Sequence, residues 1–130
     1  MAKVLVVDDA PELRQLLEVR LRQAGHRVVT AGSGEEALQV LADKGAPDVA
    51  VLDVLMPGMS GLELCALLRQ DPAYAHVPVI FLSGRVLPED IEAGRQLGAS
   101  YMTKPVVMTA LNNAIDKALA ASLPAPVESW

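Results

Sequence analysis

Polar residues with chemical capacity stand directly after four short segments of this chain that are rich in apolar or β-branched residues. Asp8 and Asp9 follow segment 3–7, Asp53 follows 49–52, Ser83 follows 79–82 and Lys104 follows 100–103. Three carboxylates held together repel one another, and a hard divalent cation such as Mg²⁺ removes that cost. A lysine and a hydroxyl facing such an ion suit a phosphate group. If these side chains meet, they favour Mg²⁺-assisted phosphoryl transfer with a carboxylate as the nucleophile.

The segments before these residues are predicted strands, and they alternate with predicted helices. Segment 3–7 is typical of a buried strand, whereas 11–24 carries apolar residues at helical spacing. The predicted strands are 3–7, 27–30, 49–52, 79–82 and 100–103, and the predicted helices are 11–24, 35–44, 62–70, 88–97 and 107–121. This alternation indicates an α/β fold of (βα)5 type, a parallel sheet with right-handed crossovers and helices on both faces.

The place of the polar residues matters because ligands of open parallel α/β sheets bind at the carboxyl ends of the strands. The second strand ends in Thr30 and Ala31, which fits a strand outside the site. Each polar residue also has an ordinary structural explanation. An aspartate after a strand is usually a helix N-cap, Ser83 can be a turn hydroxyl and Lys104 a solvated charge. An accidental gathering of all of them at one sheet edge is the weaker explanation.

Composition narrows the class of protein. The 130 residues suffice for one domain, and 52% hydrophobic but 3% aromatic residues predict an aliphatic core. The formal net charge of -5 disfavours direct binding to nucleic acid. One cysteine excludes a disulfide framework and a thiolate zinc site. No apolar run approaches the ~18 residues of a membrane span, and the first apolar run is too short for a signal peptide, so we expect a cytoplasmic protein without membrane contact.

Several motifs together resemble the receiver domain of two-component response regulators, over about residues 3–121. The motifs are Val4-Leu5-Val6-Val7-Asp8-Asp9, Val51-Leu52-Asp53, Met56-Pro57-Gly58 with Gly61, Phe81-Leu82-Ser83-Gly84 and Lys104-Pro105, with support from Gly34-Glu35-Glu36-Ala37-Leu38 and Leu97-Gly98-Ala99. The resemblance implies a doubly wound five-stranded sheet of flavodoxin-like order 2-1-3-4-5. It also implies a receiver domain over residues 1–121 and a C-terminal tail or linker over 122–130.

By that resemblance, Asp53 accepts a phosphoryl group from a histidine kinase or a histidine phosphotransfer protein. Asp8, Asp9, Asp53 and the backbone carbonyl of Leu55 bind Mg²⁺, and Lys104 pairs with a phosphoryl oxygen. Such a domain acts on itself, so we expect no enzyme with a separate substrate. The only expected chemistry is self-directed phosphotransfer and autodephosphorylation.

The resemblance further implies a conformational switch. The Ser83 hydroxyl bonds a phosphoryl oxygen once it is present, and Tyr101 moves inward when Ser83 does. The Lys104-Pro105 peptide bond is expected to be cis, which fixes the aim of the lysine. The surface formed by the fourth helix, the fifth strand and the fifth helix then changes and controls a downstream protein target or an output domain.

Two partner surfaces are predicted. The phosphodonor is expected on the exposed face of the first helix and the loop after Lys104, and the downstream target on a second face. The first-helix face contains Glu12, Arg14, Gln15 and Glu18, and the second face contains Glu92, Arg95, Tyr101 and Asn113.

Two rival functions stay open. A non-phosphorylated adaptor would keep only the fold, but the acids and the lysine are all present. A Mg²⁺-dependent phosphatase with an aspartyl intermediate, of the dehalogenase type, needs a second aspartate two residues after the nucleophile, and Leu55 occupies that position.

By the resemblance to the receiver family, Leu55 and Arg85 occupy the two positions that flank the attacking water. We therefore expect this pair to slow hydrolysis of the phosphorylated state.

Overall fold

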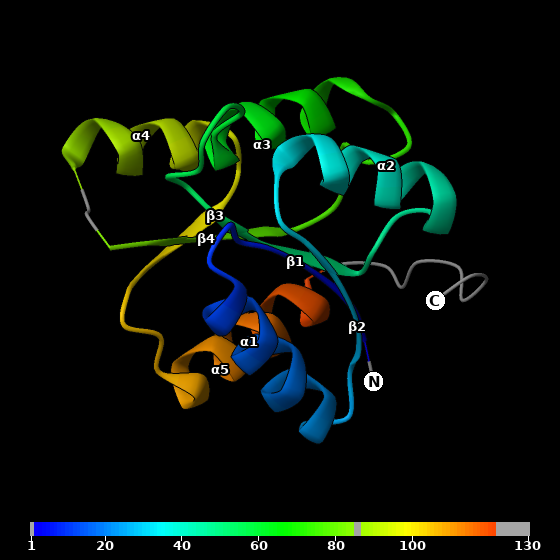
Figure 1. Cartoon of the computed structure of the whole chain (residues 1–130). Helices are drawn as coiled ribbons and strands as arrows, with labels where there is room; N and C mark the ends of the chain where they lie inside the picture. Colours follow the sequence, from blue (N-terminus) through cyan, green and yellow to red (C-terminus); the bar gives the residue numbers. More distant parts are fainter. Residues whose placement is uncertain (1, 85–86, 122–130) are drawn as a thin grey trace.

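Five strands and five helices alternate along the chain in the computed structural model, which describes residues 2–84 and 87–121 (Figure 1). The strands are β1 Lys3–Val7, β2 Arg27–Ala31, β3 Val49–Asp53, β4 Val79–Ser83 and β5 Ser100–Thr103, and the helices are α1 Pro11–Gln23, α2 Gly34–Lys44, α3 Gly61–Gln70, α4 Pro88–Gln96 and α5 Met108–Ala120. Every predicted element is present, with its ends shifted by at most one residue. Arg85 and the predicted tail, 122–130, lie outside the described residues.

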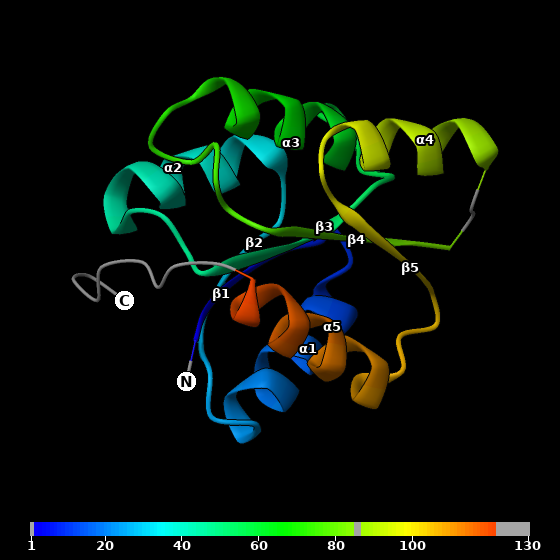
Figure 2. The same cartoon turned by 180° about the vertical axis from the view of Figure 1, so that it is seen from behind.

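The strands form one parallel sheet in the order β2-β1-β3-β4-β5, which confirms the predicted order. Helices α1 and α5 cover one face of the sheet, and α2, α3 and α4 cover the other (Figures 1 and 2). The chain runs from β1 through α1 to β2 on one side of β1, and it returns through α2 to β3 on the other side. The switch point of the topology therefore lies between β1 and β3. No helix within residues 2–84 and 87–121 combines the length and apolarity that crossing a membrane requires.

Alternate residues of the central strands supply two separate apolar cores. Leu5, Leu52 and Phe81 belong to the core under α2 and α3. The apolar residues next to them in sequence belong to the second core, together with Leu17 of α1 and Leu111 of α5. Strands β1, β3 and β4 are buried throughout because helices cover both of their faces. The edge strands β2 and β5 are partly exposed.

Strands β3 and β4 extend one residue beyond the predicted apolar runs, so Asp53 and Ser83 are themselves strand residues. Asp53 lies opposite Leu82, and Ser83 lies opposite Thr103 in the parallel ladders. Backbone pairing does not depend on side-chain polarity, which is why the ladder continues past the last apolar residue. The two polar side chains therefore leave from regular backbone, which fixes their direction more firmly than a loop would.

Two glycines open helices α2 and α3 in the same way. Each follows a serine N-cap whose hydroxyl accepts a hydrogen bond from the backbone N–H three residues on. A Cβ at Gly61 would overlap the backbone carbonyl oxygen of Asp53, whereas a Cβ at Gly34 would meet the flexible side chain of Met59 first. Gly61 therefore lets α3 begin directly against the carboxyl end of β3.

This difference predicts unequal effects of the same substitution. Gly61→Ala is expected to lower the free energy of unfolding by about 1–3 kcal/mol, because backbone atoms must move to make room. Gly34→Ala, at the matched position of α2, is expected to cost clearly less, because the Met59 side chain can turn away. Urea unfolding of both variants measures the two values. Equal losses would show that the close approach of α3 to β3 is not required.

Candidate functional site

Three carboxylates meet beyond the adjacent ends of β1 and β3. Carboxylate oxygens of Asp8, Asp9 and Asp53 all lie within 4.8 Å of one another. Asp8 and Asp53 are buried, with 1% and 4% of their surface exposed, whereas Asp9 is open to solvent. The three acids come together because β1 and β3 are neighbours in the sheet although they lie far apart in sequence, as the pairing of Val4 with Val49 and of Val7 with Leu52 shows.

Lys104 reaches these carboxylates from the end of β5. Its Nζ donates a hydrogen bond to Asp8 Oδ2 at 3.1 Å and lies 3.3 Å from Asp53 Oδ1. Its backbone N–H donates to the carbonyl oxygen of Ser83 at 2.7 Å, and the Lys104-Pro105 peptide bond is cis. Ser83 is buried at the end of β4, the strand between β3 and β5. The structure thus places the acids, the serine and the lysine at one edge of the sheet.

The charges at this edge shift one another's protonation. Burial, and then the charge of Asp8, raise the pKa of Asp53 to about 6 against the opposing effect of Lys104. Burial by itself lowers the pKa of Lys104, but its hydrogen bond to Asp8 and the charges of Asp8 and Asp53 outweigh burial, so that the pKa is raised. The lysine therefore stays charged. Its single positive charge does not neutralise the carboxylates around it.

A hard divalent cation fits this set of donors. Mg²⁺ takes oxygen ligands and is held in proteins by one or two carboxylates, with waters and phosphate oxygens in its other positions. The buried Asp8 and Asp53 gain most from neutralisation, while Asp9 is exposed to solvent. Leu55 lies two residues beyond Asp53 with its side chain half-exposed. Its backbone carbonyl stays a predicted ligand.

The backbone around Asp8 is held by partners that sequence analysis did not assign. Asp8 Oδ1 accepts a hydrogen bond from the backbone N–H of Ala10 at 2.9 Å. The backbone carbonyl of Asp8 accepts one from Arg14 Nη1 at 2.7 Å, and its N–H donates to the carbonyl of Ala31. The N-cap residue of α1 is Ala10, which has no side-chain cap, so neither aspartate takes the capping position that was the alternative explanation.

The structure corrects the placement of Arg14 on an exposed face for the phosphodonor. Glu12 and Gln15 of that face are exposed, whereas Arg14 and Glu18 are half-buried, and the guanidinium of Arg14 contacts the carbonyl of Asp8. Helical spacing shows that residue 14 lies in the first turns of α1, near the strand ends. It does not show whether a long side chain turns toward the strands or toward solvent, and that is why the contact was missed.

Tyr101 packs beside Phe81 under α4. The ring centroids are 5.9 Å apart and the ring planes are inclined by 51°. A Cβ at Gly94 of α4 would lie 3.2 Å from the Phe81 ring, so the small residue leaves room for both rings. The Tyr101 hydroxyl is buried and has no hydrogen-bond partner in the part of the chain that the structure describes. The polar end of the predicted switch residue thus lies inside the protein.

Comparisons with known sequences place the chain in one family. The family model of the response regulator receiver domain matches residues 4–116. The transcriptional regulatory protein AfsQ1 of Streptomyces coelicolor is 39% identical over 107 residues, which cover 82% of this chain and 46% of that protein. The transcriptional regulatory protein GlrR of Escherichia coli is 41% identical over 130 residues, which cover 99% of this chain and 29% of that protein. The chain spans less than half the length of these curated relatives.

Solved structures show the same fold. The chemotaxis protein CheY4 of Vibrio cholerae has a TM-score of 0.85 at 36% identity, covering 92% of this chain and 99% of that one. The signal receiver domain of a histidine kinase from Syntrophus aciditrophicus has a TM-score of 0.86 at 28% identity, covering 100% and 98%. Sequence, topology and the acidic edge of the sheet agree, and the chain belongs to the family of response regulator receiver domains.

Proposed function

We propose that this domain is a phosphoacceptor switch in which Asp53 takes a phosphoryl group from the phosphohistidine of a histidine kinase or a phosphotransfer protein. Receiver domains are generally non-catalytic signalling domains that bind Mg²⁺ at an acidic pocket and interact with histidine kinases and output domains. One observation carries the proposal. The buried carboxylate of Asp53 lies within 4.8 Å of those of Asp8 and Asp9 and 3.3 Å from the ammonium of Lys104.

The proposed transfer needs position and charge from the protein rather than a separate acid or base. A carboxylate oxygen of Asp53 attacks phosphorus, the P–O bond forms as the P–N bond to imidazole breaks, and the electron pair stays on the imidazole nitrogen. At neutral pH a carboxyl with a pKa of about 6 is mostly ionised, so the nucleophile is available. Mg²⁺ held by Asp8, Asp9, Asp53 and the Leu55 carbonyl supplies charge that offsets the phosphoryl oxygens. Lys104 supplies a second positive charge on the other side.

The proposed output surface is reached from Asp53 through Ser83 and β5. A phosphoryl group brings roughly -1.5 to -2 charge to one point and attracts the Ser83 hydroxyl. Tyr101 lies in the next strand, where it lines a groove of about 770 Å³ together with Met102 and with Ala114 and Lys117 of α5. The other residues predicted to meet the target, Glu92, Arg95 and Asn113, are exposed. This supports a protein partner over α4, β5 and α5.

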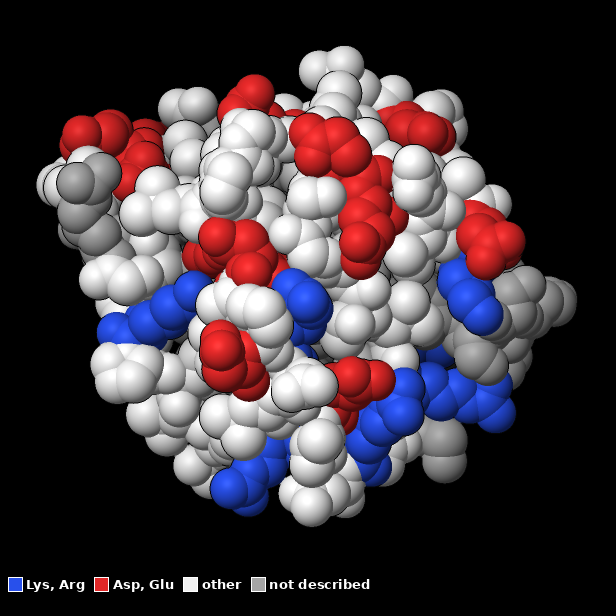
Figure 3. Space-filling view, in the orientation of Figure 1, with Lys and Arg blue, Asp and Glu red and all other residues white. Residues whose placement is uncertain are grey.

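The phosphodonor is proposed to dock over α1, beside the acidic pocket. In Figure 3 acidic side chains gather over α2, α3 and α4, whereas acidic and basic side chains lie side by side in the lower part around α1. The exposed part of α1 also presents Leu16 and Val19, with 48% and 53% of their surface exposed. A surface with charges of both signs and exposed apolar residues suits a protein partner. The acidic half of the molecule is repelled by nucleic-acid phosphates.

Phosphorylation itself is the first test. Incubation with Mg²⁺ and acetyl phosphate is expected to add one acid-stable, base-labile phosphoryl group to the wild-type protein and none to Asp53→Asn, as measured by intact mass. Asp43→Asn removes an exposed carboxylate of α2 and is the matched control, which should be labelled like wild type. Full labelling of Asp53→Asn would contradict the assignment. An unlabelled wild-type protein would favour the adaptor, and turnover of an added phosphate ester would favour the phosphatase.

The raised pKa of Asp53 predicts that the unfolding free energy of the wild-type protein depends on pH when divalent cations are absent. The carboxyl ionises near 3.8 in the unfolded chain and near 6 in the folded protein, so folding favours its protonated form. That contribution to stability is fully present below about pH 4 and is lost as the pH rises through about 6. Asp53→Asn does not titrate. When the pH is raised from about 4 to about 8, we expect the unfolding free energy of Asp53→Asn to increase relative to that of wild type by roughly 1–3 kcal/mol.

Urea unfolding of wild type and Asp53→Asn in the presence of a chelator at these two pH values measures the gain. Mg²⁺ at the higher pH should then stabilise wild type more than the variant, because the ionised carboxylate is one of the proposed ligands. A stability difference that does not change with pH would show that Asp53 titrates as it does in the unfolded chain.

The side chain of Leu55 is expected to prolong the phosphorylated state. It is half-exposed two residues from Asp53 and cannot hydrogen-bond a water molecule, whereas an amide at this position can orient one. Leu55→Asn is expected to speed loss of the phosphoryl group several-fold, measured after the phosphodonor is removed. Leu67→Asn changes a leucine of similar exposure on α3 and should leave the rate unchanged. A Leu55→Asn rate equal to wild type would remove the idea.

A further inference from the structure

We propose that Arg14 is a positioning residue of the Mg²⁺ site, which holds the Asp8-Asp9 corner in the orientation that metal binding needs. The inference rests on the proposed function of the acidic pocket and assigns a role to a residue outside it.

Arg14 makes its contact at the backbone between the first two carboxylates. Its Nη1 donates a hydrogen bond of 2.7 Å to the carbonyl oxygen of Asp8. On its other side the guanidinium lies across Gly32, just after β2, since a Cβ at Gly32 would be 3.0 Å from the same Nη1 and 3.5 Å from Cζ. The half-buried guanidinium therefore fills the space between the end of β1 and the turn after β2.

The carbonyl that Arg14 holds belongs to the peptide unit that joins Asp8 to Asp9. A peptide unit is planar, so fixing its carbonyl direction fixes the rotation of the whole plane. That rotation sets the backbone angles through which the two carboxylates are aimed. Without the hydrogen bond, the plane can turn, and the exposed Asp9 moves relative to the buried Asp8.

The other hydrogen bonds of Asp8 come from different residues, and Arg14 is the side chain that holds the carbonyl of this peptide unit. The N–H of Asp8 bonds the carbonyl of Ala31 in β2, Oδ1 accepts from Ala10, and Oδ2 accepts from Lys104. These contacts hold the residue and its carboxylate in place. Groups that orient metal ligands from behind typically change metal affinity by about 10–100-fold when removed.

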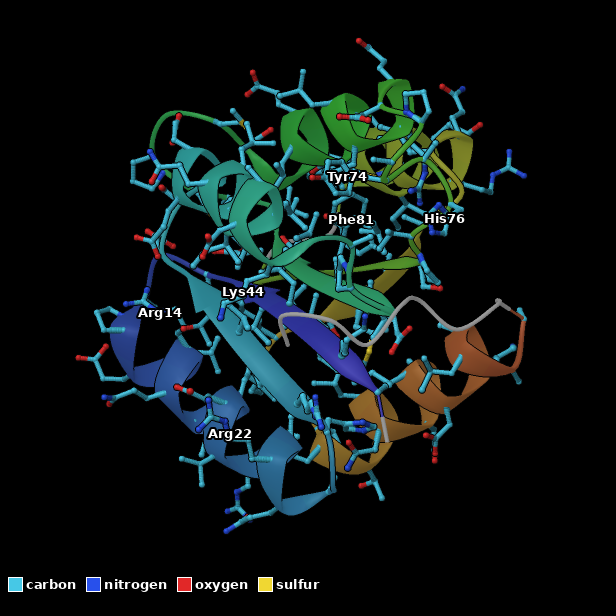
Figure 4. All side chains as sticks on the ribbon, turned by 90° about the vertical axis from the view of Figure 1, so that its right-hand side faces the viewer. Arg14, Arg22, Lys44, Tyr74, His76 and Phe81 are labelled. Carbon is cyan, nitrogen blue, oxygen red and sulfur yellow. The ribbon has the colours of Figure 1, made fainter. Side chains whose placement is uncertain are left out.

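Arg22 offers a matched control on the same helix. Like Arg14, it donates a hydrogen bond to a backbone carbonyl, in this case from Nη2 to the carbonyl of Val28 in β2 at 3.2 Å. It also forms an ion pair with Glu18 at 2.8 Å. Figure 4 shows both arginines on α1, with Arg14 at the end near the turn after β2 and Arg22 further along the helix. The two substitutions therefore remove the same kind of contact at different distances from the carboxylates.

The test compares Mg²⁺ binding by isothermal titration calorimetry in wild type, Arg14→Met, Arg14→Lys and Arg22→Met. Arg14→Met is expected to raise the Kd for Mg²⁺ about 10-fold or more. Arg14→Lys should lie between Arg14→Met and wild type, because lysine can still donate one hydrogen bond to the Asp8 carbonyl. Arg22→Met should bind Mg²⁺ like wild type. Circular dichroism and urea unfolding establish the fold of each variant, and Arg14→Lys carries the test if Arg14→Met does not fold.

A second measurement separates positioning from general damage. The rate of labelling by acetyl phosphate is followed as a function of Mg²⁺ concentration. In Arg14→Met the half-saturating Mg²⁺ concentration should rise by the same factor as the Kd, and the rate at saturating Mg²⁺ should stay near that of wild type. Wild-type Mg²⁺ affinity in Arg14→Met, or an equal loss in Arg22→Met, would overturn this inference alone. A wild-type protein that binds no Mg²⁺ would overturn the proposed function as well.

Discussion

Two buried carboxylates that face a single lysine set the energetics of this domain. Asp8 and Asp53 are almost inaccessible to water, and Lys104 lies within 3.3 Å of both. Burial and the charge of Asp8 disfavour the ionised form of Asp53 and raise its pKa to about 6. The folded chain thus holds negative charge where its electrostatic free energy is unfavourable. A cation or cationic partner that enters the pocket lowers this free energy. The proposed affinity for divalent ions rests on this same repulsion between the buried carboxylates.

The sheet can carry this cost because the acids stand at the ends of its best-buried strands. β1, β3 and β4 are covered on both faces, and their apolar residues feed two cores on opposite sides. The polar residues follow without a break, so the rigid part of the fold extends to Asp53 and Ser83. Gly61 adds to this by letting α3 begin against the backbone of Asp53. The carboxylate of Asp53 therefore leaves from strand backbone that is hydrogen-bonded to β4 and packed against α3.

The sequence was sufficient to predict which residues gather at the sheet edge, and insufficient to predict what holds them there. Alternating strand and helix periods determine the order of elements, and parallel pairing brings residues 8, 53, 83 and 104 to one side without further information. Contacts of long side chains do not follow from periodicity. Arg14 was therefore expected to face solvent, and the bond from Ala10 to Asp8 was not expected at all. Tyr101 was recognised by its position, but that position does not show that its hydroxyl is buried.

The same lysine that offsets the acids also connects them to the edge strand. Its side chain is shared between Asp8 and Asp53, while its backbone N–H is bound to the carbonyl of Ser83. In the proposed switch, a phosphoryl group on Asp53 draws the ammonium away from its shared position and draws the Ser83 hydroxyl toward the same point. Both movements act on the ends of β4 and β5, and Tyr101 lies in β5 three residues before the lysine. In this proposal the change of charge at Asp53 acts on the outer surface through Lys104 and Ser83, because Lys104 contacts the pocket with its side chain and the end of β4 with its backbone N–H.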